Sequence, residues 1–160
     1  MQSVGDPQSV LALELRRTFR APADAVFRAW TQPAALREWW CPPGWAASEV
    51  DIDLRVGGAY RIAMRRRDRA GEIAVHGRFL EVTPPERLVF TWCWEGAFFD
   101  DPEGRVVLAF RQLGDITELV LRHENFADPG VRQQHWSGWL AACGRLDHLL
   151  SAKGTAVSAD

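Results

Sequence analysis

The segment DPGVRQQHWSGWLAACGRLDHLL, residues 128–150, decides the fold of this chain. Asp128 followed by Pro129 is a favourable helix start, because aspartate caps free backbone amides and proline fits the first helical position. Helical spacing then gathers most of the large apolar side chains on one stripe. The stripe consists of Trp136, Trp139, Leu140, Cys143, Leu146 and Leu150. The opposite side of the helix carries Ser137, Ala141, Arg145 and His148. We therefore predict a helix that ends near Ser151, before Gly154, with one face buried.

Residues 46–125 have the pattern of an antiparallel sheet. Turn signals, among them Gly57-Gly58 and Gly114-Asp115, divide this region into short runs in which apolar and polar residues alternate. The predicted strands are 48–55, 59–67, 72–83, 88–94, 106–112 and 117–125. A meander of six strands is the most economical arrangement of these runs.

A first strand and two short helices are predicted before this meander. Residues 11–19 alternate in the way typical of a half-buried strand. Pro22 and Pro33 each stand where the first residue of a helix is favoured, and apolar residues follow both at helical spacing. These residues are Val26, Phe27 and Trp30 in one helix and Leu36, Trp39 and Trp40 in the other. The run Cys-Pro-Pro-Gly at 41–44 predicts a connector, because proline lacks an amide donor and disfavours helix before it.

Size and charge limit the domain organisation and the partners. The chain has 160 residues, which suits one domain. We expect this domain over residues 10–151, with flexible tails over 1–9 and 152–160. Nineteen basic and 21 acidic residues give a net charge of −2, which provides no field for nucleic acid or an anionic membrane. No apolar run of about 18 residues and no secretory signal is present, so a cytoplasmic location is expected.

Metal-binding and phosphate-binding patterns are missing from the sequence. Cys41, Cys93 and Cys143 are far apart and outside any CxxC pair, which predicts reduced thiols. No two histidines have metal-ligand spacing on one helix. Gly57-Gly58 joins two strands and lacks the helix that follows a phosphate loop, and the arginines at 65–67 fit a solvated hairpin tip. We expect no metal and no cofactor.

Several segments of the chain, in their order and spacing, carry a resemblance to a known family. They are FRAPADAVFRAW at 19–30, LREWW at 36–40, DLRVGG at 53–58, EVTPPERLVFTW at 81–92, and Gly138-Trp139 leading to Leu146 and Leu149-Leu150. With these segments the chain resembles the activator of Hsp90 ATPase homologue 1-like family. The likeness is to bacterial proteins related to the C-terminal domain of the activator, within the START/Bet v 1-like (SRPBCC) superfamily.

The resemblance implies an α+β helix-grip fold. In this fold a curved antiparallel sheet of about seven strands has two short helices after strand one, and a long C-terminal helix packs over the sheet. The superfamily uses the space between helix and sheet to hold apolar or amphipathic small molecules. The family name also implies Hsp90 as a partner. Against that role, the eukaryotic activator has a further N-terminal domain that a chain of this length is not expected to contain.

Aromatic and apolar side chains are predicted to line a pocket between the sheet and the last helix. Side chains two apart on a strand share a face, and three rows of this kind should face the helix. The predicted pocket residues are Trp39, Trp40, Tyr60, Met64, Phe90, Trp92, Trp94, Leu121, His123, Trp136, Trp139, Leu140 and Cys143. The alternative is a core that these large rings fill completely.

Three residues are candidates for acid–base chemistry. His123 ends an apolar strand row, where it suits a ligand contact or catalysis, or a hydrogen-bonded structural role. His76 is ambiguous, because a bulge at Gly77 would reverse its face. Asp147 stands at the edge of the helix stripe, facing a pocket or, more simply, pairing with an arginine. Catalysis would require two of these groups to converge in one pocket.

Three functions are consistent with these patterns. The first is binding of a hydrophobic or amphipathic small molecule without catalysis. The second is a protein interaction, either as an Hsp90 cochaperone or as a homodimer built on exposed aromatics such as Phe98 and Phe99. The third is a cyclase, dehydratase or hydrolase that uses the pocket histidines and Asp147. The sequence favours the first function and does not name the ligand.

Overall fold

The structure, a computed structural model, describes residues 11–68, 70–95 and 102–158. Its helices and strands follow the predicted order. They are β1 (Leu11–Phe19), α1 (Ala23–Thr31), α2 (Pro33–Trp39), β2 (Trp45–Ile52), β3 (Ala59–Arg66), β4 (Glu72–Thr83), β5 (Arg87–Glu95), β6 (Gly104–Leu113), β7 (Ile116–Phe126) and α3 (Pro129–Ser158).

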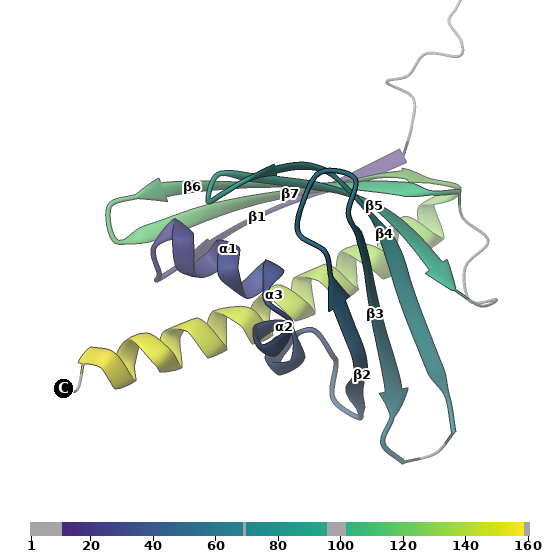
Figure 1. Cartoon of the computed structure of the whole chain (residues 1–160), viewed down its shortest axis with the longest axis horizontal. Helices are drawn as coiled ribbons and strands as arrows, with labels where there is room; N and C mark the ends of the chain where they lie inside the picture. Colours follow the sequence, from purple (N-terminus) through teal and green to yellow (C-terminus); the bar gives the residue numbers. More distant parts are fainter. Residues whose placement is uncertain (1–10, 69, 96–101, 159–160) are drawn as a thin grey trace, which may run out of the picture.

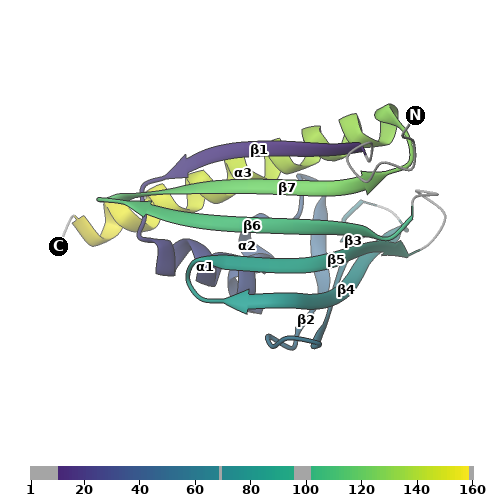
Figure 2. The same ribbon diagram turned by 90° about the horizontal axis from the view of Figure 1, so that it is seen from above.

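The strands form one antiparallel sheet in the order β1-β7-β6-β5-β4-β3-β2. Although β1 and β2 are consecutive in sequence, they lie at opposite edges, and α1 and α2 carry the chain from one edge to the other (Figure 1). Strands β2 to β7 form the predicted meander, and α3 runs along the opposite side of the sheet from the viewer in Figure 2. The seven-stranded sheet with its long terminal helix confirms the α+β helix-grip class.

The long helix rests on one part of the sheet only. The backbone of α3 comes close to β1 and β7 and to α2, while Figure 2 shows β4 and β2 on the other side of the sheet from β1 and β7, behind which α3 runs. Side chains therefore have to span the distance between α3 and the strands at the other edge. This geometry places the large aromatic residues, and any hollow between them, on the β3–β5 side of α3.

The bulge that we expected at Gly77 lies further along β4. The register of β4 and β5 shifts between Phe79 and Glu81, so that Leu80 is 48% exposed. Gly77 instead makes room for a ring. A Cβ atom there would lie 2.1 Å from the Thr91 carbonyl oxygen and 2.7 Å from Cε1 of Tyr60, and the Tyr60 hydroxyl donates a hydrogen bond to that oxygen at 2.6 Å.

Several element boundaries differ from the predicted ones, and two of the differences have a local reason. Strand β2 ends at Ile52, not at residue 55, because Asp53 begins a tight turn in which Gly57 has φ +84°. A Cβ at Gly58 would lie 2.0 Å from the Asp53 carbonyl oxygen. Helix α3 continues to Ser158, past the end predicted near Ser151, since one glycine weakens a helix by about 1 kcal/mol without ending it. Among the described residues, no helix is long and apolar enough to cross a membrane.

Candidate ligand cavity

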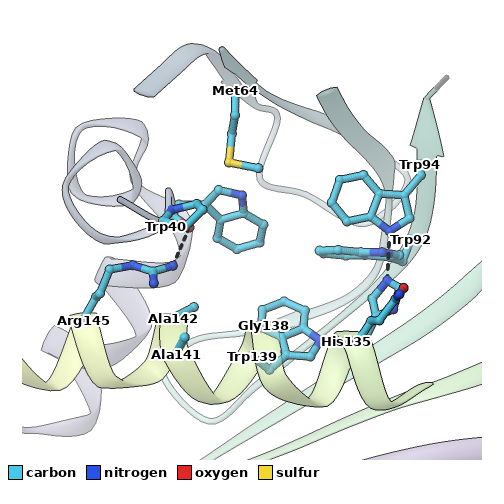
Figure 3. A pocket seen from close by; sticks show the side chains of 12 residues that line it. Trp40, Met64, Trp92, Trp94, His135, Gly138, Trp139, Ala141, Ala142 and Arg145 are labelled. Atoms are coloured by element: carbon cyan, nitrogen blue, oxygen red, sulfur yellow. Dashed lines mark hydrogen bonds between the residues drawn. The ribbon is translucent and has the colours of Figure 1, made fainter. Parts of the chain in front are cut away.

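A cavity of about 210 Å³ lies between α3, β3, β5 and the residues that follow α2. Its walls are mostly aromatic or aliphatic, with three polar side chains among them (Figure 3). The lining residues are Trp40, Pro42, Met64, Trp92, Trp94, Gln134, His135, Gly138, Trp139, Ala141, Ala142 and Arg145. The cavity thus lies on the β3–β5 side of α3, where the helix is separated from the sheet.

One flank of α3 lines the cavity where the cavity opens to solvent. Gln134, Gly138, Ala141 and Arg145 follow one another at helical spacing, so they lie along one side of the helix. The first three are exposed to solvent, which makes this side the opening. A Cβ atom at Gly138 would have no neighbour within 4 Å. Small residues on this flank therefore leave the hollow that a large side chain would fill.

Four tryptophans give the cavity most of its wall. Trp92 is the central ring, with centroid distances of 6.0 Å to Trp40, 5.5 Å to Trp94 and 5.1 Å to Trp139. Trp40 and Trp139 also contact each other edge to face, with their ring centroids 5.7 Å apart. Such edge and tilted arrangements stabilise each ring beyond simple burial, by about 0.5–1.5 kcal/mol per pair. The wall is thus a mutually supported set of rings.

Two histidines hold two of these rings in place. The indole N–H of Trp94 donates to Nε2 of His135 at 2.9 Å, and Nδ1 of His135 lies 2.9 Å from the Val131 carbonyl oxygen. This pairing fixes the tautomer of His135 with its proton on Nδ1. On the sheet side, the indole N–H of Trp139 donates to Nδ1 of His123 at 3.0 Å. Both histidines accept from a tryptophan of the cavity wall, which fixes the ring orientation.

His123 is a buried, neutral acceptor. It is 1% exposed, and burial, together with the nearby His135, lowers the pKa of His123 to about 3. An imidazole with this pKa stays unprotonated near neutral pH and is a very weak base. Gly104 makes its position possible, since a Cβ at residue 104 would lie 2.9 Å from Nε2 of His123.

The other two acid–base candidates lie elsewhere. His76 is exposed on the face of the sheet away from α3, where its Nδ1 lies 2.9 Å from Glu95 Oε2. The groove of about 470 Å³ at this position is larger than the cavity, and three of its charged or polar side chains pair with one another, since Arg61 and His76 both contact Glu95. Asp147 pairs with Arg17 of β1 at 3.4 Å. The structure does not bring His123, His76 and Asp147 together, so these residues form no acid–base pair.

Arg145 places a positive charge at one end of the cavity. Its Nε and Nη2 atoms donate to the carbonyl oxygens of Trp39 and Trp40, at 2.9 and 3.0 Å, and the second contact is visible in Figure 3. Burial lowers the pKa of Arg145, against the opposite effect of Cys41 and Cys143. Arg145 thus caps the carbonyl groups at the C-terminal end of α2 and also lines the cavity.

The predicted pocket residues fall into four groups. Trp40, Met64, Trp92, Trp94 and Trp139 line the cavity. Tyr60 and Phe90 line a separate hollow of about 20 Å³, and His123 another of about 20 Å³. Trp39, Leu121 and Cys143 lie in the packed core. The last two predicted residues, Trp136 and Leu140, lie on the opposite flank of α3, and Leu140 is 42% exposed.

The predicted face of α3 was therefore rotated relative to the observed one. Over residues 129–153 of the helix, the buried side chains are His135, Trp139, Ala142, Cys143, Leu146 and Leu150. Ala141 and Arg145, which we placed on the solvent side, line the cavity instead. Pro42, Gln134, His135, Gly138 and Ala142 are the other lining residues that the sequence did not indicate. The one available signal was the row of small residues at 138, 141 and 142, which apolar periodicity ignores.

No group of three or more metal-binding side chains occurs within the part of the chain that the structure describes. Phe98 and Phe99, which we considered as an interaction surface, lie outside the described residues.

The sheet, the gripping helix and the cavity between them define a START/Bet v 1-like protein of the helix-grip class. The family described as Activator of Hsp90 ATPase homolog 1-like protein matches residues 20–151, and this chain belongs to that family. The predicted resemblance is confirmed.

Solved structures agree with this assignment. A Chromobacterium violaceum protein is similar with a TM-score of 0.78 at 28% identity, over 87% of this chain and 96% of that one. An AHSA1 protein from Silicibacter pomeroyi has a TM-score of 0.76 at 26% identity, over 89% of this chain and 99% of its own. A protein of Rhizobium leguminosarum, titled as uncharacterized, reaches 0.75 at 25% identity, with 90% and 96% covered. None of the curated proteins is a match to this sequence.

Proposed function

We propose that this protein binds a small, mostly apolar molecule in the cavity beside α3. The observation that carries the proposal is a cavity wall of four tryptophans around a hollow of about 210 Å³. Ligand sites are typically concave and apolar, with a few polar groups that orient the ligand. Gln134, His135 and Arg145 are such groups at this site.

The volume limits the size of the ligand. An apolar cavity of about 150 Å³ is enough to hold benzene, whereas sites for drug-sized molecules have about 300–1,000 Å³. At about 210 Å³, the cavity suits a compound with one or two rings. A sterol or a long lipid chain does not fit within it.

A titration with naphthalene, followed through the indole N–H signals in ¹H–¹⁵N NMR spectra, tests the proposal. Binding should shift the signals of Trp40, Trp92, Trp94 and Trp139, which line the cavity, and leave that of Trp136, on the opposite flank of α3, in place. Native mass spectrometry on protein purified without added ligand provides a second measurement. If naphthalene and related one- and two-ring compounds shift none of the four wall signals, the proposal is wrong.

A variant that fills the cavity sharpens this test. Because a Cβ at Gly138 meets nothing within 4 Å, Gly138→Leu should fold normally and place its side chain in the hollow. We expect naphthalene affinity to fall about tenfold or more, since overlap with a buried group costs about 1–3 kcal/mol. Ser137→Leu, an exposed neighbour on α3, is the matched control and should bind as the unmodified protein does. Equal affinity of the two variants would place the ligand outside this cavity.

A further inference from the structure

Arg145 is a charged residue in a mostly apolar wall. Within the described part of the chain its guanidinium bonds to two backbone carbonyl oxygens, those of Trp39 and Trp40, and to no carboxylate. These bonds use Nε and Nη2, so the hydrogens of Nη1 take no part in them. The carbonyl groups are dipoles and do not neutralise the charge. A cation beside an apolar hollow with no counter-ion favours an anion in that hollow.

Two more arginines, both exposed, lie on segments next to the cavity wall, Arg37 three residues before Trp40 and Arg67 three residues after Met64. Arg37 donates to the Ala47 carbonyl oxygen at 3.2 Å, and Arg67 to that of Trp45 at 3.3 Å. Burial raises the pKa of the Cys41 thiol, and Arg145, Arg67 and Arg37 act against that rise. Arg37 and Arg67 are exposed and do not line the cavity, so Arg145 is the arginine of the three that borders the hollow.

The nearby carboxylates are already paired elsewhere. Asp147, two residues beyond Arg145 on α3, pairs with Arg17, and Glu38 pairs with Lys153. Within the ranges that the structure describes, Arg37, Arg67 and Arg145 have no ion-pair partner among the salt bridges formed, and no acidic side chain lines the cavity. The charge of Arg145 at this end of the cavity is therefore not paired with a carboxylate among the described residues.

We infer that the molecule bound in this cavity is a small aromatic acid, with its rings against the tryptophans and its carboxylate beside Arg145. The inference rests on the proposed function and adds the chemical class of the ligand. A guanidinium recognises a carboxylate through charge-assisted hydrogen bonds, which are roughly twice as strong as neutral ones. In an apolar surrounding this attraction is screened less than at an open surface.

The test compares 2-naphthoate with 2-naphthamide, which share their shape and differ in charge. Dissociation constants come from the same indole NMR titration at pH 7.5. We expect the acid to bind about 10- to 100-fold more tightly, the effect of one hydrogen bond to a charged group. Affinities within a factor of two of each other would overturn the inference while leaving the proposed function intact. Binding of neither compound, nor of naphthalene, would contradict both.

Variants assign the preference to Arg145. Arg145→Gln should reduce the ratio of the two affinities to near one, whereas Arg145→Lys, which keeps the charge, should retain a clear preference for the acid. Arg111→Gln removes a charge from an exposed position on β6 and should leave the ratio unchanged. Both dissociation constants are measured on the same variant. A general loss of stability in Arg145→Gln would therefore weaken both ligands and leave their ratio unchanged. A preference that persists unchanged in Arg145→Gln would overturn the assignment.

Discussion

At the scale of the residue, the contact between His123 and Trp139 links the cavity wall to pH. His123 accepts the indole N–H of Trp139, and a buried acceptor can do this only while it is unprotonated. Protonation would remove the acceptor and bury a charge at once. The orientation of Trp139 is therefore linked to the charge state of one side chain.

Stability should fall with acid because of His123. Its pKa is about 3 in the folded protein and about 6.5 in an unfolded chain. Between these values the unfolded state takes up a proton that the folded state does not, so stability is lost as the pH falls below about 6.5. From pH 7.5 to pH 5 this residue alone should remove about 2 kcal/mol from the free energy of unfolding.

Urea unfolding of wild type and His123→Gln at the two pH values measures this effect. Glutamine keeps an acceptor for Trp139 and does not titrate, so the variant should lose about 2 kcal/mol less than the wild type on acidification. His148→Gln, at an exposed position on α3, is the control. The same pH dependence in wild type and His123→Gln would show that His123 is not held neutral by burial.

At the scale of the element, two glycines differ in the space available for a side chain. In β4, the Gly77 position is closed by the Thr91 carbonyl and the Tyr60 ring. In α3, the Gly138 position is open, and its flank of the helix forms the cavity mouth. The sequence shows a glycine in both places, and only the packing distinguishes the role of each.

Gly77→Ala should destabilise the fold. A methyl group there would meet backbone at 2.1 Å, and overpacking of this kind costs about 1–3 kcal/mol, which corresponds to about 2–4 °C in Tm for each kcal/mol. Gly144→Ala is the matched control, because the nearest atom to its new Cβ is 4.0 Å away. That substitution should stabilise α3 by about 0.5–1 kcal/mol. Calorimetry that finds Gly77→Ala as stable as the wild type would contradict the close packing at this site.

At the scale of the whole molecule, the order of elements was predictable and the location of the cavity was not. Alternation in β4, and the Asp128-Pro129 start of α3, depend on local chemistry that a sequence displays directly. Which flank of α3 faces the hollow depends on how the helix is rotated on the sheet, and contacts from distant segments fix that rotation. Arg17 binds Asp147 on one flank, and His123 binds Trp139. Leu140 is more apolar than Gly138, yet it is the glycine that leaves space.

Ligand binding should stabilise the complete domain. A ligand that binds only the folded state at 100 times its dissociation constant adds about 2.7 kcal/mol, or about 5–10 °C in Tm for a chain of this size. A thermal unfolding series with 2-naphthoate measures this shift, and Gly138→Leu should show little of it. An equal shift in both proteins would indicate a binding site elsewhere on the molecule.

The exposed flank of α3 also has a consequence for kinetics. Gln134, Gly138 and Ala141 border the cavity and face solvent, so a ligand has a route in and out that leaves the contacts of α3 with β1 and β7 untouched. Exchange then does not wait for part of the fold to open, a step that takes microseconds to seconds in proteins that enclose their ligands completely. Association should proceed at the rate of an ordinary encounter, and the lifetime of the complex should follow from affinity alone. On the proposed function, the protein should therefore equilibrate with the surrounding concentration of its ligand without waiting for a conformational opening.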